Sequence, residues 1–195
     1  MPLTRRERAW RETHERLYEA ALREIERVGF GDVRIEKICE ETQLSRPTFY
    51  AHFSNKDGVV SELLHRFMDG IARGLEARAR TRRTLAEVLD DLVELCHSAN
   101  SMTSERLRRE LAAYLPRHHD IDLFSASPVF AILTGAIVEA AQRCEIRAVP
   151  DARALARQLA VVINGFFLAH PNDPEQAARE ARAVLELLLQ GLRRD

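Results

Sequence analysis

The chain has 195 residues, of which 46% are hydrophobic and 30% are charged, and its formal net charge is -1 at pH 7. This composition is typical of a soluble globular protein that is long enough to bury a large core. The balanced charge excludes a protein that coats nucleic acid by bulk electrostatic attraction. Glycine and proline are sparse and strand-like alternation is rare, so we predict an all-helical chain.

The first predicted helix begins after Thr4, which forms a T-x-x-E capping box with Glu7, and ends at Gly29. Three arginines lie ahead of its apolar stripe and could reach a phosphate or a minor groove, or could simply form a solvated charged end. These arginines are Arg5, Arg6 and Arg8. The apolar stripe consists of Leu17, Ala20, Ala21, Leu22, Ile25 and Val28.

Two short helices joined by a tight turn are predicted between Val33 and Lys56. The first has Asp32 as its expected N-cap and places Val33, Ile35, Ile38 and Cys39 on one apolar face. Leu44 then returns to the core. Ser45 offers an N-cap hydroxyl and Pro47 suits the first turn, so the second helix is predicted over about Arg46 to His52.

In the second of these helices, the spacing of the residues separates a face that packs inward from faces that stay exposed. Phe49 and Phe53, four residues apart, can pack inward together, which leaves the polar side chains for the outer faces. Two helices with this turn form a helix-turn-helix, whose second helix can enter a DNA major groove. Arg46 has forked donors for guanine or phosphate, and Thr48 and Tyr50 can donate to phosphate. Lys56 suits phosphate as a point charge.

We therefore predict a set of DNA contacts in this segment, with Arg46 reading a base edge and the hydroxyls and Lys56 positioning the helix on phosphate. His52 has two readings, a phosphate contact or a histidine packed between helices. Cations and acids are equal in number over residues 1–60, so any DNA affinity must come from local placement of the cations. The predicted DNA-binding residues are Val33, Arg46, Pro47, Thr48, Tyr50, His52 and Lys56.

The run SRPTFYAHFSNKD, Ser45 to Asp57, following Ile35 to Cys39, resembles the N-terminal DNA-binding domain of TetR family transcriptional regulators. The motif covers about Gly29 to Leu64, and chain length and helical layout extend the likeness to the whole chain. One departure is Gln43, which stands where the family usually has a glycine in the turn. A left-handed glutamine would cost about 1 kcal/mol, so the turn is either slightly strained or different in geometry.

The resemblance implies a three-helix helix-turn-helix DNA-binding domain over residues 1–55 and a larger helical domain over residues 56–195, with about nine helices. It also implies a homodimer through helices at about 152–169 and 174–191, and a cavity for a small, largely apolar effector in the second domain. Ligand binding would then displace the helix that follows Ser54 and change the separation of the two recognition helices.

The second domain is predicted from helix start signals. Ser54 to Asp57 and Thr84 to Glu87 match capping boxes, and Ser127-Pro128 has proline at the first helical position. A shorter helix runs from about Ser104 to Leu115, and Asp151 and Asp173 each cap a later helix. Gly70 and Gly74 lie inside the helix that follows Ser54, for close packing or for a bend.

The helix from Pro128 to about Cys144 is apolar on nearly all sides, so we expect it at the centre of the second domain. The candidate effector-lining residues are apolar side chains on the helices that would surround it, and most such residues are ordinary core. They are Phe67, Met68, Ile71, Leu92, Cys96, Met102, Leu107, Tyr114, Phe124, Phe130, Leu133, Ile137 and Phe167.

Other chemistry receives little support. The cluster His118-His119-Asp120 lacks the i, i+4 spacing of a helical metal site, so no metal or other cofactor is expected. No phosphate loop or nucleophile motif is present, so we expect no enzyme.

The three cysteines are predicted to be buried reduced thiols on helices rather than a redox sensor; they are Cys39, Cys96 and Cys144. The charged N-terminus and the absence of a long apolar run predict a cytoplasmic protein without a membrane span.

The sequence therefore predicts a dimeric, ligand-responsive regulator, a repressor, that binds a palindromic double-stranded DNA operator. The alternatives are a TetR-like regulator without a small-molecule effector, acting through a protein partner or as an activator, and an all-helical interaction module or enzyme without DNA binding.

Overall fold

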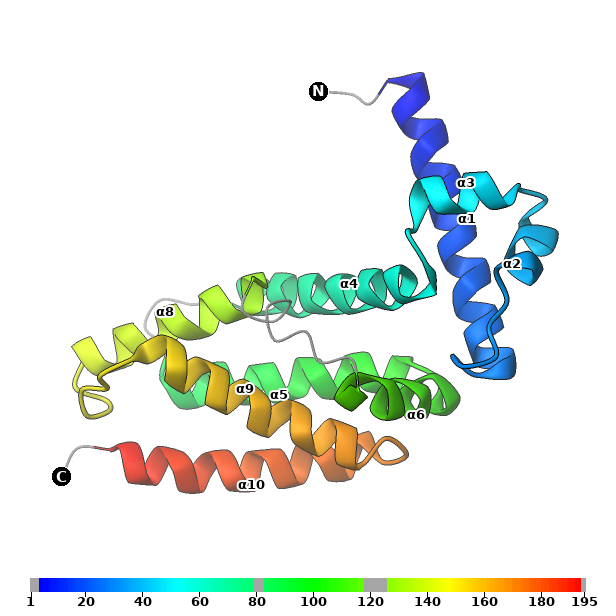
Figure 1. Ribbon diagram of the computed structural model, residues 1–195. Helices are drawn as coiled ribbons and strands as arrows, with labels where there is room; N and C mark the ends of the chain where they lie inside the picture. Colours follow the sequence, from blue (N-terminus) through cyan, green and yellow to red (C-terminus); the bar gives the residue numbers. More distant parts are fainter. Residues whose placement is uncertain (1–3, 79–82, 118–125, 194–195) are drawn as a thin grey trace. The chain divides into compact units, whose positions relative to one another are not determined.

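The computed structural model describes residues 4–78, 83–117 and 126–193, and the part of the chain that it describes is helical without strands (Figure 1). It divides into two compact units, unit 1 over Met1–Leu64 and unit 2 over His65–Asp195. The helices are α1 (Arg5–Val28), α2 (Ile35–Thr42), α3 (Arg46–His52), α4 (Lys56–Ala77), α5 (Leu85–Met102), α6 (Glu105–Tyr114), the 3-10 turn η1 (Leu115–Arg117), α8 (Pro128–Gln142), α9 (Ala152–Ala169) and α10 (Pro174–Leu192).

Most helix starts are fixed by local side-chain caps, as the sequence predicts. Thr4 and Glu7 form a complete capping box at α1, and Thr84 and Glu87 form another at α5. Each box satisfies two backbone amides that the first helical turn leaves without partners. Single side-chain caps start the other helices α3, α6, α8, α9 and α10, and these caps are Ser45, Ser104, Ser127, Asp151 and Asp173.

Two helix starts differ from the sequence prediction. The residue before α2 is Arg34, whose side chain makes no capping bond, whereas Asp32 lies in the turn after α1, where its amide donates to Gly29 O. Helix α4 begins at Lys56, and the amide of Gly58 donates to Asn55 Oδ1 at 2.9 Å. The start of α4 is therefore one residue later than a cap at Ser54 would give.

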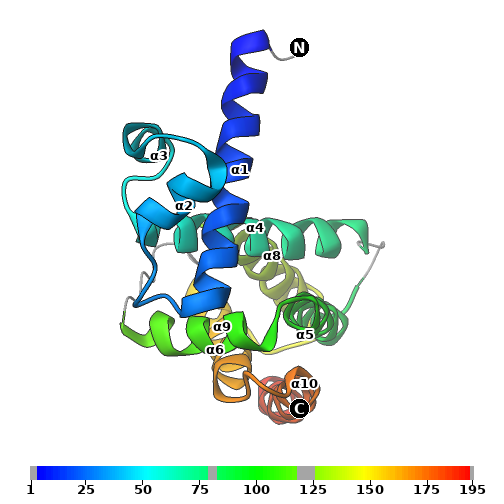
Figure 2. The ribbon, with the colours of Figure 1, turned by 90° about the vertical axis from the view of Figure 1, so that its right-hand side faces the viewer.

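Unit 1 is held together by an apolar core between its helices. Helix α2 packs against α1 and against α3 (Figure 2). Phe49 of α3 is completely buried and Phe53 is 4% exposed, with ring centroids 5.7 Å apart, so the predicted inward pair is confirmed. The core continues through Leu17, Ala20, Ala21 and Ile25 of α1, Ile38 and Cys39 of α2, and Val59 and Val60 of α4.

Unit 2 has its own core, to which α4, α5, α8, α9 and α10 contribute buried side chains. Helix α10 packs along α5 and α9, and α9 also packs against α8 (Figure 1). Phe130, Leu133 and Ile137 of α8 are at most 2% exposed. Helix α8 thus contributes one face to this core, whereas its other face is exposed at Ala131, Gly135 and Val138, so the prediction of a helix buried on nearly all sides is wrong.

By length and hydropathy, α9 could cross a membrane, which differs from the prediction of a chain without a membrane span. Its face formed by Ala156, Leu159, Ile163 and Phe167 nevertheless lies in the core of unit 2. Because this face is buried in the core of unit 2, we interpret α9 as a core helix.

The cysteines are only partly as predicted. Cys39 and Cys96 are buried, and burial raises the pKa of Cys96 to about 12, which keeps it an unreactive thiol. Cys144 is exposed and lies beyond the end of α8 with φ 58°, so the prediction of a buried helical thiol is wrong there. Helix α8 ends at Gln142 and has Arg143 as its C-cap, so Cys144 does not continue the buried face of the helix.

Candidate nucleic-acid interface

The turn between α2 and α3 is a Schellman motif closed by a glutamine. The amide of Leu44 donates to Cys39 O at 3.1 Å, and that of Gln43 donates to Glu40 O at 3.3 Å. Gln43 has φ 56° and ψ 34°, the left-handed conformation that normally selects glycine. Of the two possibilities raised by the sequence, a strained turn or a different geometry, the structure has the strained turn.

Helix α3 is positioned by its cap and by its buried aromatic pair. Ser45 Oγ accepts a hydrogen bond from the amide of Thr48 at 3.2 Å and lies 2.7 Å from the Thr48 hydroxyl. With Phe49 and Phe53 inside, the outer face of this short helix carries exposed Arg46, Pro47 and Tyr50. Thr48 and His52 are half-buried. The helix is thus anchored on one side and presents donors on the other.

Arg46 begins α3, and its guanidinium group has two neighbours. Its Nη1 lies 2.7 Å from Glu36 Oε1 on α2, and it hydrogen-bonds to the Tyr50 side chain one turn further along α3. The Tyr50 hydrogen bond, followed by the negative charge of Glu36, raises the pKa of Arg46 above its ordinary value. The Arg46 and Glu36 side chains remain 56% and 50% exposed, so the charged pair is open to a ligand.

The other acids of α2 also have cationic partners. Glu40 lies 2.6 Å from Lys37 on the same helix, and Glu41 lies 2.8 Å from Arg23 of α1. These partners neutralise carboxylates that would otherwise repel phosphate. A local arrangement of cations is therefore compatible with the equal numbers of cations and acids over residues 1–60.

Lys56 and Val33 have structural partners in addition to the DNA contacts predicted for them. Lys56 Nζ donates to the carbonyl oxygens of Phe30 and Gly31, both at 3.1 Å, and lies 5.0 Å from the centroid of the Phe30 ring. It thereby ties the start of α4 to the turn after α1. Val33 is 9% exposed and belongs to the core. A phosphate contact by Lys56 and a DNA contact at Val33 stay predictions.

A cluster of rings, which the sequence reading did not find, joins α1 to the C-terminal end of α3. Trp10 lies 5.1 Å from His14 and 4.7 Å from His52 between ring centroids, and His14 lies 4.6 Å from Phe53. Trp10 is still 51% exposed. The only sequence signal was the i, i+4 spacing of Trp10 and His14 on one helix, because the contact with α3 depends on how the helices pack.

His52 is packed in this cluster, as one of its two sequence readings proposed. Its Nδ1 is buried without a hydrogen-bond partner, and the same holds for Nδ1 of His14. Burial, and then the neighbouring His14, lower the pKa of His52. His14 also lies 3.7 Å from Glu62 of α4. The neutral form of His52 is therefore favoured, and its other ring nitrogen would determine any phosphate contact.

In unit 2, most of the candidate effector-lining residues belong to one apolar core. Phe67 and Met68 are partly buried against it. Met102 is 90% exposed at the end of α5, Tyr114 is half-buried, and Phe124 lies outside the described residues. Leu107 of α6 is buried. Those inside the core are Ile71, Leu92, Cys96, Phe130, Leu133, Ile137 and Phe167.

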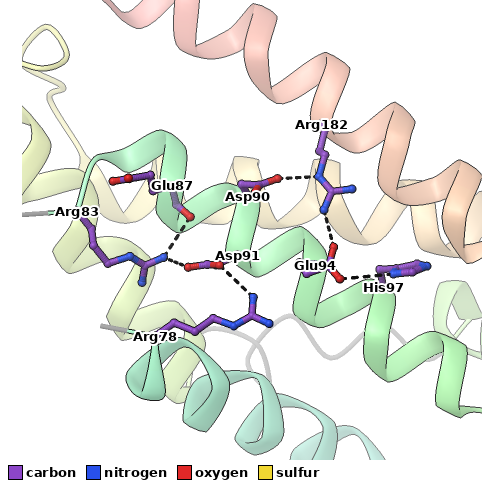
Figure 3. A network of polar contacts seen from close by, with 8 residues as sticks. All are labelled: Arg78, Arg83, Glu87, Asp90, Asp91, Glu94, His97 and Arg182. Carbon is purple, nitrogen blue, oxygen red and sulfur yellow. Dashed lines mark hydrogen bonds and ion pairs between the residues drawn. The ribbon is translucent and has the colours of Figure 1, made fainter. Parts of the chain in front are cut away.

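A charged network on the surface of α5 joins this helix to α10 (Figure 3). Arg182 of α10 donates to Asp90 and to Glu94, each at 2.7 Å. Glu94 also lies 3.9 Å from His97 on its own helix. The two acids are one helical turn apart, so a single arginine from α10 pairs with both.

A second group in the same network is centred on Asp91 (Figure 3). Arg78, just after α4, lies 3.0 Å from Asp91, and Arg83, just before α5, pairs with the other carboxylate oxygen. Arg83 also donates to Glu87 O. These ion pairs join the end of α4 to α5, which is a structural role. The cluster His118-His119-Asp120 lies outside the described residues, and the described ranges contain no group of His, Cys, Asp and Glu that could hold a metal ion.

Apolar side chains remain exposed on the outer faces of α9 and α10. Val161 is 61% exposed on α9, and Leu187 and Leu188 are 67% and 41% exposed on α10. Their helices are those for which the sequence predicts a dimer contact. Val138 of α8 is 41% exposed as well.

Comparison with known proteins agrees with this geometry. Residues 17–63 match the family model of bacterial regulatory proteins, tetR family. The chain is 26% identical over 185 residues to the HTH-type transcriptional regulator BetI from Pseudomonas fluorescens, covering 90% of this chain and 92% of that protein.

Solved structures share the fold over nearly the whole chain. The transcriptional regulator FadR from Bacillus subtilis, in complex with stearoyl-CoA, aligns with a TM-score of 0.72 at 22% identity, covering 91% of this chain and 98% of that one. The fatty acid degradation regulator FadR from Bacillus halodurans aligns with a TM-score of 0.68 at 17% identity, covering 94% and 97%.

The capped α3, the Schellman turn and the exposed Arg46 and Tyr50 define a helix-turn-helix DNA-binding protein of all-helical fold. The family model adds that residues 17–63 match the tetR family of bacterial regulatory proteins. The whole chain is similar in sequence to the transcriptional regulator BetI and in fold to TetR-family transcriptional regulators.

Proposed function

We propose that the protein is a cytoplasmic homodimeric repressor that binds a palindromic operator through one α3 helix of each subunit and leaves it when a small, largely apolar effector binds in unit 2. The observation that carries the DNA-binding part is the exposed, charged N-terminal end of α3, where Arg46 lies on a helix fixed by the Ser45 cap and the buried Phe49. N-terminal residues of a recognition helix are those that reach base edges in this motif.

The side chains of α3 would make two kinds of contact with DNA, one that reads a base and others that position the helix on the backbone. Arg46 would read a base edge, because its guanidinium can still offer donors beyond those used by Glu36 and Tyr50. Thr48 and Tyr50 would donate to phosphates on either side and so fix the register of the helix. Pro47 would pack against the sugar-phosphate chain, since it has no donor of its own.

The dimer is proposed from α9 and α10, whose exposed Val161, Leu187 and Leu188 would be covered by the same helices of a second subunit. A palindromic operator requires this symmetry. Two half-sites one DNA turn apart, about 34 Å, must be bound at once, so a small change in the separation of the two α3 helices lowers affinity sharply.

The effector site is proposed within the apolar core of unit 2, around Phe67, Met68 and Phe130, which supports a largely apolar ligand. Helix α4 runs without interruption from Lys56 to Ala77, so it belongs to both units by sequence. A ligand that displaces the Phe67 and Met68 turn of α4 would move the end that follows α3. The FadR structure in complex with stearoyl-CoA shows that a protein of this fold binds a long acyl chain.

The test is an electrophoretic mobility shift with the DNA upstream of the protein's own coding sequence. The wild-type protein should shift a fragment at nanomolar to micromolar concentration, whereas Arg46→Ala and Tyr50→Phe should weaken the specific complex at least tenfold. Glu40→Ala is the matched control, because Glu40 is an exposed acid of α2 paired within its own helix. Absence of any shift at low salt would contradict the proposal.

Release by an effector is tested on the same complex. Acyl-CoA esters and other apolar metabolites are titrated into the shifted complex, and a Phe130→Ala variant serves to locate the site. Release that the variant abolishes supports the effector site in unit 2. Failure of every apolar ligand to release the complex supports a regulator without a small-molecule effector.

A further inference from the structure

Glu36 and Arg46 form one polar unit at the surface predicted to face DNA. Glu36 lies in the first turn of α2 and Arg46 is the first residue of α3, so the pair links the two helices of the helix-turn-helix. Glu36 Oε1 and Arg46 Nη1 are 2.7 Å apart, and both side chains are about half exposed, at 50% and 56%. The Glu36 carboxylate, an acceptor, and the Arg46 guanidinium, a donor, are thus exposed next to each other.

Donor counting leaves this pair able to bind something else. A guanidinium has five N-H donors in a planar fork, and that of Arg46 has Glu36 and Tyr50 as neighbours, which leaves donors for a further partner. A carboxylate has about four lone-pair sites on two oxygens, so Glu36 can accept a second donor while it holds Arg46. Both side chains can therefore contact one base pair while the Glu36–Arg46 ion pair stays intact.

A phosphate is a poor partner for this pair. Phosphate oxygens accept hydrogen bonds and carry negative charge, so a carboxylate 2.7 Å from the guanidinium repels them. A base edge that presents both acceptors and a donor does not have this conflict. The presence of Glu36 therefore directs Arg46 away from the backbone and towards a base pair.

Among the base pairs, G·C fits the order of groups best. In the major groove it presents guanine N7 and O6, two acceptors, followed by the 4-amino donor of cytosine. Arginine pairs with O6 and N7 in a bidentate manner, and glutamate accepts from the cytosine amino group. An A·T pair places the adenine amino donor where the fork of Arg46 expects an acceptor, and the thymine O4 acceptor where Glu36 expects a donor.

We propose that Glu36 is a second base-reading residue and that the Glu36–Arg46 pair reads one G·C base pair in each half-site, with Arg46 on the guanine and Glu36 on the 4-amino group of the cytosine. This inference rests on the proposed DNA-binding function and adds the identity of one base pair to it. It also gives α2 a part in sequence recognition, in addition to α3.

The experiment first identifies the base pair. Full-length wild type and Arg46→Ala are each used to select sites from a pool of random duplexes. The position at which Arg46→Ala loses its preference should be a G·C pair in the wild-type sites. If the position is any other base pair, the inference is overturned while DNA binding stands. If the wild type selects no site, the proposed function fails and this inference fails with it.

The second step removes a single amino group. The cytosine of that pair is replaced by 2-pyrimidinone, which lacks the 4-amino group, and binding is measured by fluorescence anisotropy. Wild type should lose roughly fivefold or more in affinity, whereas Glu36→Ala should be weaker on normal DNA and lose less than about twofold on the analogue. Equal losses by wild type and Glu36→Ala would overturn the assignment of Glu36 to the cytosine.

Two controls separate base reading from general effects. Glu40→Ala removes an acid from the same helix and should respond to the analogue like wild type, because Glu40 pairs with Lys37 instead of with α3. The analogue placed at a G·C pair outside the selected site should affect no variant. On nonspecific DNA, Glu36→Ala should steepen the salt dependence by about one unit in log K against log salt, because Arg46 becomes free to bind phosphate.

Discussion

At residue 43 the chain adopts a backbone conformation that its side chain disfavours. Gln43 closes the turn between α2 and α3 with φ 56°, and the same Schellman pattern recurs at Cys144 after α8, with φ 58°. A left-handed residue with a Cβ costs about 1 kcal/mol. Both turns therefore form without glycine, because two hydrogen bonds and the packing on either side determine them.

Gln43→Gly should stabilise the protein by about 1 kcal/mol in urea denaturation, because glycine adopts this conformation without steric cost. Gln43 is exposed, so the loss of its side chain should matter little. Gln43→Ala is the control and should change the free energy of unfolding by less than about 0.5 kcal/mol. A glycine variant no more stable than the alanine variant would show that the turn is not strained.

His52 should make stability depend on pH. Burial and the neighbouring His14 lower the pKa of His52, while in the unfolded chain it titrates near its ordinary value of about 6.5. Between the lowered pKa and about 6.5 the unfolded state binds more protons, so stability rises with pH there. The contribution is fully present above about pH 6.5 and is lost as the pH falls towards the lowered pKa.

Urea denaturation of wild type and His52→Gln between pH 5 and 8 tests this expectation. The variant should show a weaker fall in stability on the acid side, because glutamine does not titrate and can still occupy part of the ring cluster beside Trp10. Parallel curves for the two proteins would show that His52 is not the group responsible.

The residues of α3 could be predicted from the sequence, but their partners could not. The spacing of Phe49 and Phe53 separates the buried face from the exposed one, because the two residues are one helical turn apart, with Phe49 on α3 and Phe53 at its C-cap. Glu36 lies ten positions before Arg46 on another helix, and Trp10 lies far from His52 in the chain. Such contacts depend on how helices cross, which no local pattern specifies.

At the scale of elements, the glycines of α4 have different surroundings. A Cβ added at Gly74 would lie 2.5 Å from Leu95 Cδ2 and 3.0 Å from its Cδ1, whereas one added at Gly70 would meet nothing within 4 Å. Gly74 therefore permits the close approach of α4 and α5, and the reading of a glycine for close packing is supported there. Gly70 has no such neighbour among the described residues.

Gly70→Ala should stabilise the protein by about 1 kcal/mol, because alanine is the better helix former. Gly74→Ala gains the same helix propensity but must displace Leu95, and overpacking of this kind typically costs about 1–3 kcal/mol. It should be the less stable of the two variants in thermal denaturation. Equal melting temperatures would contradict the close packing of α4 against α5.

The start or end of a helix can be predicted from the sequence when the signal that determines it is local. Capping boxes at Thr4 and Thr84 act within four residues, so the sequence predicts them in full. The sequence predicts the start of α2 too early, because Arg34 makes no side-chain cap and no local signal marks the true start. It predicts the end of α8 too late, because the turn at Cys144 lacks the glycine that usually marks a helix end.

At the scale of the whole molecule, the proposed dimer depends on the exposed apolar residues of α9 and α10. Val161→Glu and Leu187→Glu, made together, place charges in the proposed interface and should raise the dimer dissociation constant at least tenfold in analytical ultracentrifugation. Met102→Glu is the matched control, because Met102 is apolar and 90% exposed but lies on α5. Dissociation by the control, or none by the double variant, would place the dimer contact elsewhere.

The central claim is that the exposed end of α3 binds DNA as one half of a symmetric reader, and hydroxyl-radical footprinting tests it most directly. On the fragment upstream of its coding sequence, the wild-type protein should protect two patches related by two-fold symmetry, about one helical turn apart. Arg46→Ala should lose both patches together at the same protein concentration. Uniform cleavage in the presence of wild type at low salt would contradict the account.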